Sequence, residues 1–307
     1  MYRETLQLIR LIVRLIKTKN IFFFWFFIRF ISTFFPLISI YLFSYTLKQI
    51  EDGVVLHQIS FTLIAILAVF ILDNFTRLLS IHKLAYIISN TEFGIHQFFL
   101  LNVSTKDKQQ RHEVVQTVRN FSEAVRTTLE IIRQPGIDSL ISLITIPIVL
   151  LFLDFKVFIL SLAYITIYYF TDQYTTEKYI QKKDIQNAKT EIYYAKLQDS
   201  NDIKDEERQY GHQFHKLCRW GFIEWFSLQN IAVIFYSLIL FYLTFASAAH
   251  SKHISDVVLI MGYIASIQVH LNSFSTIKDR MADTQVALTR LVSCKNCLSV
   301  DLSDLMR

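Results

Sequence analysis

The sequence predicts an all-α membrane protein with six transmembrane helices and long helical extensions on the cytoplasmic side. Of its 307 residues, 52% are hydrophobic and 15% aromatic, and they gather in six apolar runs. A helix needs roughly 20 apolar residues to cross the ~30 Å hydrocarbon core of a bilayer. Only six Gly and three Pro occur, and no strand-like alternation is visible. Helices are therefore expected, because backbone polar groups in lipid must pair within their own segment.

The six runs follow one another along the chain with short connections at three places. The third and fourth are short, but both can lengthen into neighbouring polar residues, and only Asp154-Phe155-Lys156 separates them, which predicts a tight turn. Pro36 lies inside the first run and predicts a kink there. The runs cover residues 21–47, 59–81, 137–153, 157–171, 225–249 and 257–277.

The N-terminal segment 5–17, TLQLIRLIVRLIK, has basic residues on one helical face and aliphatic residues elsewhere. This pattern is typical of an amphipathic helix lying in the membrane interface, and the alternative is the start of a long first span. No small-residue cleavage site is visible, so we expect an uncleaved membrane anchor.

Basic residues predict the orientation. With six spans, both termini and both long polar stretches share one side, which holds 26 Lys and Arg, whereas the other side holds three. The positive-inside rule places the richer side in the cytoplasm. The net charge of +5 fits cytoplasmic loops that face anionic lipid and needs no nucleic acid. We expect an inner or cell membrane protein with both termini cytoplasmic.

Two polar stretches, 82–134 and 172–224, follow the second and fourth runs. In their flanks, apolar residues return every three to four positions, as in amphipathic helices, whereas their centres are polar throughout. Each stretch is expected to be a helix, a short turn and a returning helix. Arms of about 20 residues would reach about 30 Å beyond the bilayer. Helical extensions of this length could contact a partner in the cytoplasm.

Three segments in this order resemble the membrane domain of ABC exporters of the type IV fold. FGIHQFFLLNVSTKD is similar to the arm that leads into the first coupling helix of that family, SNDIKDEERQYGHQF to the second coupling helix, and DRMADTQVALTRL to the exit helix before the ATPase domain. The resemblance covers residues 1–293, which are expected to form one six-helix domain, and leaves 294–307 as a tail.

The resemblance implies one subunit of a transporter that works as a homodimer or heterodimer in the lipid bilayer. No G-x-x-x-x-G-K-[ST] phosphate loop occurs in the sequence, so this chain is expected to be no enzyme, to hold no cofactor and to use ATP only through a separate ATPase partner. A non-transporting regulatory or scaffold protein on the same fold is the alternative. The resemblance assigns coupling to the ATPase to Ser104, Lys106, Asp107, Lys108, Arg111, Asp205, Glu206, Glu207 and Arg208.

Ionisable residues inside spans are costly and normally face the bundle interior or water. Asp73 and Arg77 are four residues apart and could pair, either along a translocation path or as a structural ion pair. Arg29 is expected to reach the interface with its long side chain. The last run carries further polar residues that could line a pore, Gln268, His270 and Asn272.

The remaining candidates for chemistry are weak. Cys294 and Cys297 have the spacing of half a zinc site, but no second pair of ligands follows them, and Cys218 stands alone. His57, His250 and His253 fall on expected outer loops and are expected to be solvated. We expect no metal site and no catalytic residue.

Overall fold

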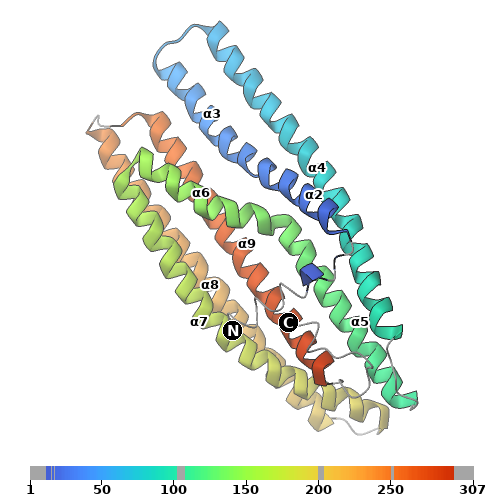
Figure 1. Ribbon diagram of the computed structural model, residues 1–307. Coiled ribbons are helices and arrows are strands. Elements are labelled where there is room, and N and C mark those ends of the chain that lie inside the picture. Colours follow the sequence, from blue (N-terminus) through green and yellow to red (C-terminus); the bar gives the residue numbers. More distant parts are fainter. Residues whose placement is uncertain are drawn as a thin grey trace. The chain divides into compact units, whose positions relative to one another are not determined.

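The computed structural model describes residues 12–14, 16, 18–101, 108–199, 204–249 and 252–293, and every regular element in these ranges is helical (Figure 1). Six helical stretches are long and apolar enough to cross a membrane. This confirms the predicted all-α architecture with six transmembrane helices. The stretches are Lys19–Glu51, Leu56–Leu101, Val114–Leu153, Phe155–Tyr179, Glu207–Ala248 and Ile254–Thr289.

The first stretch is broken near Pro36, as predicted. Helix α2 covers Lys19–Ser32 and α3 covers Phe34–Glu51. The break falls at Thr33, before the proline, because Pro36 has no N–H to donate to the carbonyl of Ser32 one turn earlier. The hydroxyl of Ser32 donates to the Arg29 carbonyl at 2.8 Å, next to the break.

The polar stretches are continuous with the spans. Helix α4 (Leu56–Leu101) has 46 residues, α7 (Phe155–Asp199) and α8 (Lys204–Ala248) have 45 each, and α9 (Ile254–Ser293) has 40. At 1.5 Å per residue, α4 is about 69 Å long, more than twice the ~30 Å bilayer core. The predicted helical extensions are therefore present. Both expected tips fall partly outside the described residues, at 102–107 and 200–203.

The third spanning stretch contains a kink that the sequence analysis did not predict. Helix α5 (Lys108–Ile131) passes through the π-helical turn η1 (Ile132–Gly136) into α6 (Ile137–Leu153). Gln134 has the extended dihedrals φ −161° and ψ 117°. Pro135 explains them, because a proline disfavours helical dihedrals in the residue before it. The chain thus changes direction just before Asp138.

The chain forms two compact units, Met1–Ile146 with His253–Arg307, and Pro147–Lys252. In the first unit, α5 packs on both α4 and α9 in the extension. A buried apolar cluster fills this contact, and the Phe99 and Phe121 rings meet edge to face at 6.1 Å. We call it the extension core; it contains Ile12, Ile88, Ile95, Phe99, Val114, Val118, Phe121, Val125, Leu129, Leu288 and Leu291.

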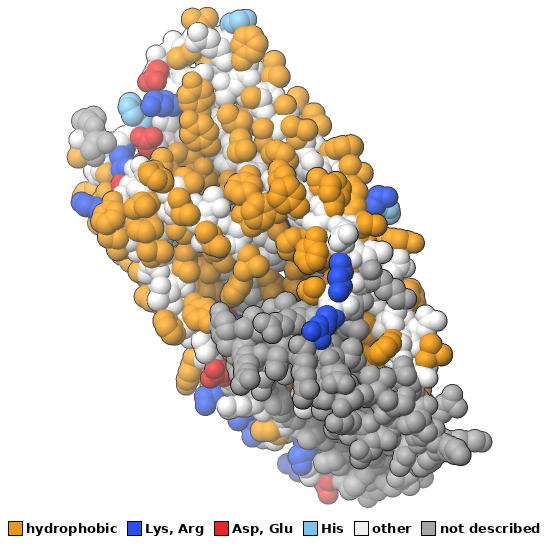
Figure 2. All heavy atoms as spheres, viewed as in Figure 1, with side chains coloured by type: hydrophobic (Ala, Val, Ile, Leu, Met, Phe, Trp, Pro, Cys, Tyr) orange, Lys and Arg blue, Asp and Glu red, His pale blue; other side chains and the backbone are white. Residues whose placement is uncertain are grey.

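The spanning part of the first unit carries its large apolar side chains on the outer surface rather than in a core. Large apolar side chains of α4 point outward there, and Phe61, Leu67 and Phe75 are all exposed. In Figure 2, hydrophobic side chains cover much of the upper part of the face turned to the viewer. An apolar outer surface is what a helix in lipid requires. Of the expected amphipathic helix at 5–17, only 12–14 and 16 are described, and Ile16 packs against Phe22, Leu84 and Ile87.

In the second unit, α7 and α8 run side by side in opposite directions. Their contacts pair residues whose numbers rise on α7 as they fall on α8, the signature of an antiparallel pair. The Tyr164 and Phe235 rings stack at 5.4 Å, Thr176 donates to Glu224 at 2.8 Å, and Lys189 donates to Gln209 at 2.9 Å. The second polar stretch is therefore a helical hairpin that begins within the spans.

Asp154 forms the predicted tight turn between α6 and α7. Its carboxylate accepts the N–H groups of Lys156 and Val157 at 2.9 and 3.1 Å, which caps the start of α7. It also accepts bonds from Lys252 and the Tyr242 hydroxyl. Burial raises the pKa of Asp154, but the hydrogen bonds from Lys252, Val157 and Tyr242 and the charge of Lys252 outweigh it and hold the pKa below its ordinary value.

Replacing Phe121 by Ala tests the extension core. Phe121 is fully buried, so its truncation removes the edge-to-face contact with Phe99 and leaves a cavity. Such a change costs about 3–5 kcal/mol of unfolding free energy. The thermal unfolding midpoint of the purified protein in detergent should fall clearly. The matched change Phe93→Ala, at a position 66% exposed on α4, should alter it little, and equal effects would contradict a packed core.

Candidate functional site

Arg29 lies in a buried ionic contact and does not reach the membrane interface. The expectation that it would was wrong, because its side chain is 0% exposed. Its Nη2 donates to the Asp138 carboxylate, and its Nη1 donates to the Ser32 hydroxyl at 2.8 Å. Asp138 lies in the first turn of α6, 109 residues away in sequence, so local spacing gave no sign of this pairing.

A second arginine shares the same carboxylate. Arg77 on α4 donates through Nη1 to Asp138 Oδ2 at 3.2 Å and through Nη2 to both oxygens of Asp73 at 3.3 Å. Thr33 donates its hydroxyl to Asp138 Oδ1 at 2.9 Å. The predicted Asp73–Arg77 pair therefore exists, and Asp138 extends it into a four-residue cluster with Arg29.

The formal charges of this cluster cancel, with two arginines against two aspartates. That balance matters because one uncompensated charge inside a bilayer is costly, and intramembrane ionisable groups pair with one another. Asp138 on α6 binds α2 through Arg29 and α4 through Arg77, and it binds the break between α2 and α3 through Thr33. The two breaks, at Thr33 and at Gln134, bring these helices together around one carboxylate.

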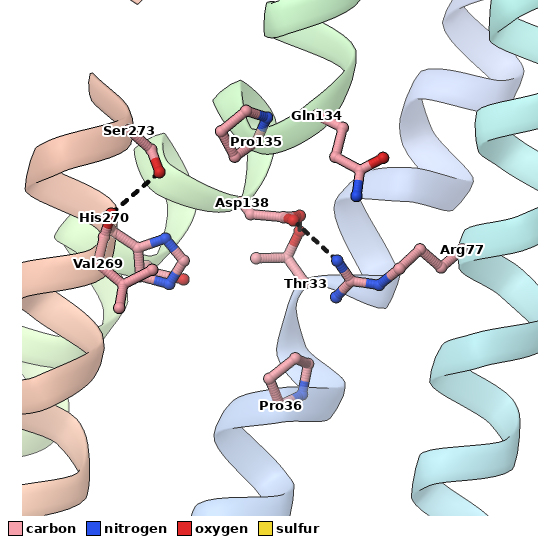
Figure 3. Close-up of a pocket in the computed structure, with 10 residues that line it drawn as sticks. Thr33, Pro36, Arg77, Gln134, Pro135, Asp138, Val269, His270 and Ser273 are labelled. Atoms are coloured by element: carbon pink, nitrogen blue, oxygen red, sulfur yellow. Dashed lines mark hydrogen bonds and ion pairs between the residues drawn. The ribbon is translucent and has the colours of Figure 1, made fainter. Parts of the chain in front are cut away.

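A cavity of about 230 Å³ adjoins the cluster within the first unit (Figure 3). Arg77 reaches it from α4, Asp138 from α6, and His270 from α9. His270 Nδ1 lies 3.4 Å from the Ser139 hydroxyl, and the Ser273 hydroxyl donates to the Val269 carbonyl at 3.0 Å. The full lining is Thr33, Pro36, Arg77, Gln134, Pro135, Asp138, Ser142, Val269, His270 and Ser273.

The structure brings together only part of the polar set predicted for the spans. Arg77 and His270 line the cavity, and Asp73 contacts Arg77 without lining it. Gln268 and Asn272 are half-buried on α9 and are not among the lining residues. Sequence reasoning missed Asp138, Gln134 and Ser142. A lone carboxylate at the start of an apolar run was the available signal for Asp138.

The residues predicted for coupling to an ATPase fall at the edges of the described ranges. Asp205, Glu207 and Arg208 are exposed in the first turns of α8. Lys108, Arg111 and Glu206 have a described helical backbone, whereas nothing is described of their side chains. Ser104, Lys106 and Asp107 lie outside the described residues. The described part of the second tip is thus a charged, solvent-facing helix start.

Among the described residues, no three His, Cys, Asp or Glu side chains lie close enough together to hold a metal ion. Cys218 is an exposed free thiol. Cys294, Cys297 and His250 lie outside the described residues.

Comparison with solved structures identifies the architecture. The chain is similar to a bacterial Atm1-family ABC exporter solved with ATP bound, with a TM-score of 0.74 and 9% sequence identity over 93% of this chain. This chain has the transmembrane fold of an ABC exporter. It spans 55% of the length of that exporter. No protein-family model and no curated protein matches the sequence. Six apolar helices in this fold make it a multi-pass membrane protein.

Replacing Asp138 by Asn tests the ionic cluster. The change leaves Arg29 buried without its carboxylate, and breaking a buried pair costs about 3–5 kcal/mol. Asp73→Asn should cost much less, because Arg77 keeps its bond to Asp138. Urea unfolding in detergent micelles, followed by circular dichroism, gives both values. Equal losses would show that Asp138 does not hold the central place in the cluster.

Proposed function

We propose that this chain is the membrane-spanning subunit of an ABC-type transporter, which moves a substrate across the membrane with ATP hydrolysed by a nucleotide-binding partner. The observation that carries the proposal is the exporter fold over 93% of the chain. A sequence identity of 9% supports only the fold. The proposed function therefore also depends on the properties of this chain's own residues.

The long helices supply the mechanical part of the proposal. Helix α4 runs unbroken from span to extension, and so do α7, α8 and α9. A continuous helix transmits a displacement at its end, whereas a flexible loop would absorb it. The extension core ties α4, α5 and α9 together, so these three helices would move as one body. A partner that pushes on the tips could thereby reorient the spans.

The proposed energy source is ATP bound by a partner. No phosphate loop occurs among the 307 residues, and only six glycines are present. We infer that ATP acts only through a partner and that this chain carries no catalytic group or cofactor of its own. The partner would dock on tip residues 104–113 and 200–209, where Asp205, Glu207 and Arg208 offer exposed charges.

Orientation and assembly complete the proposal. The 26-to-3 distribution of basic residues supports cytoplasmic termini and cytoplasmic tips. Two copies, or one copy and a homologue, would form the pore in an inner or cell membrane. The cavity lined by Arg77 and His270 would provide polar side chains along the proposed translocation path. Gln268 and Asn272 stay predicted pore-lining residues, in contact with substrate when two subunits meet.

Reversing a charge at the second tip tests the docking role. Glu207→Lys places a cation where the partner is expected to meet an acidic surface, and an unfavourable charge contact costs several kcal/mol, so recruitment should fall about tenfold or more. Recruitment is measured as ATPase activity that co-purifies with the tagged protein in mild detergent. The matched control is Glu123→Lys, which reverses an exposed charge on α5 away from the tip and should leave the activity unchanged.

Two results would contradict this proposal. Equal co-purifying activity with Glu207→Lys and the native protein would remove the tip from the docking surface. Absence of any ATPase with the native protein would instead support the non-transporting alternative.

A further inference from the structure

The cavity beside the ionic cluster presents hydrogen-bond donors more openly than it presents negative charge. Arg77 has 26% of its side chain exposed, against 14% for Asp73 and 11% for Asp138. Asp73 contacts Arg77 without lining the cavity. The most accessible charge in the cavity is therefore a guanidinium.

The one carboxylate in the cavity lining is already well supplied with donors. Asp138 Oδ1 accepts from Thr33, and Oδ2 accepts from both Arg29 and Arg77. A cation entering the cavity would have to displace these donors. A ligand oxygen, in contrast, could accept a hydrogen bond from Arg77, and the amide of Gln134 and the hydroxyl of Ser142 also line the cavity.

The hydrogen bonds of Arg77 are long for a guanidinium between two carboxylates. Its contacts measure 3.2 Å to Asp138 and 3.3 Å to Asp73. Charge-assisted N–H···O bonds usually lie at about 2.7–2.9 Å. A ligand that offers an oxyanion at that shorter distance could compete with Asp73 for the guanidinium. The fork of N–H groups on arginine suits planar carboxylates and phosphates in particular.

The size of the cavity limits what can enter it. A volume of about 230 Å³ is smaller than the ~300–1,000 Å³ of typical drug-sized ligand pockets. It fits a headgroup, with the rest of the molecule outside. Val269, which is 60% exposed, and Pro36 form apolar parts of the wall beside the polar groups. That combination suits a polar head joined to an apolar chain.

We propose that this cavity binds the carboxylate or phosphate head of an amphipathic anion, with Arg77 as the principal donor and Asp73 as its internal competitor. The proposal names a substrate class for the path in the proposed transporter and rests on that function for its biological role. Binding itself needs neither ATP nor a partner, so the two ideas can fail separately: the ATPase co-purification tests the function, and ligand binding tests this inference.

The test measures equilibrium binding to the full chain in lipid nanodiscs, by dialysis against radiolabelled probes, with empty nanodiscs subtracted. The probes are octanoate, octyl phosphate and octylamine, which share one chain length and differ in charge. The two anions should bind saturably, and octylamine should not. Unlabelled inorganic phosphate should compete poorly. Equally strong competition by it would overturn the amphipathic part of the proposal and identify a free anion.

Variants of the cluster separate binding from structural support. Arg77→Lys keeps the charge for both aspartates but loses the two-pronged donor, so anion affinity should fall about tenfold, the scale of one charge-assisted hydrogen bond. Arg126→Lys is the matched control in the extension, where Arg126 pairs with Glu92 at 3.4 Å, and should bind as the native protein does. Equal weakening in both variants would overturn the assignment.

Asp73→Asn distinguishes the two roles most clearly. A purely structural role of Asp73 predicts that this change lowers anion affinity, whereas the proposal predicts that it raises anion affinity. Removing the competing carboxylate frees Arg77, so anion affinity should rise several-fold even though the protein becomes less stable. Unchanged or weaker anion binding would overturn the proposal, as would octylamine binding that this variant abolishes. This variant carries the test even if Arg77→Lys fails to fold.

Discussion

The length of the helices relative to the lipid is the constraint on which the rest of this structure depends. Helix α4, at 46 residues, is about 69 Å long, and only ~30 Å of it can lie in hydrocarbon. Its spanning part turns large apolar side chains outward, whereas its extension buries Ile88, Ile95 and Phe99 in a core shared with α5 and α9. Without that core the extension would be a single amphipathic helix in water, with no partner for its apolar stripe. The core packs three long helices into one rigid unit. Coupling to a distant partner needs this rigidity.

The ionic cluster joins the same helices inside the spans. Asp138 holds α2 and α4 to α6 at the point where two breaks in helix geometry meet. Together with Asp73 it balances the positive charges of Arg29 and Arg77. Arg29 is fully buried and closely bonded, so the Arg29–Asp138 pair is the fixed part of the cluster. Arg77 is partly exposed and has longer contacts, so it is the part that would respond to the proposed ligand. Since α4 also contributes to the extension core, a change at Arg77 and the proposed push at the tip would act on one continuous helix.

The sequence predicted the architecture well because hydrophobic runs and helical periodicity are local signals. Six spans, the Asp154 turn and the helical extensions all followed from patterns within a few tens of residues. The cluster did not follow, since Arg29 and Asp138 are 109 residues apart and only the fold brings them together. The prediction for Arg29 was wrong for that reason. A lone arginine near a helix end normally extends to water unless it pairs with a carboxylate. The turn at Gln134 was missed because Pro135, which lies between the returning helix and the third run, was not interpreted as a break.

Side-specific labelling of introduced cysteines tests the central proposal, that each extension of the six membrane-crossing helices faces the cytoplasm. Cys218, Cys294 and Cys297 are first replaced by Ser, and Glu207→Cys, Glu123→Cys or Lys156→Cys then adds a single thiol at an exposed position. A membrane-impermeant maleimide should label Glu207→Cys and Glu123→Cys only in inside-out vesicles, and Lys156→Cys only in intact cells. Labelling of all three from one side, or of either extension site in intact cells, would contradict the account.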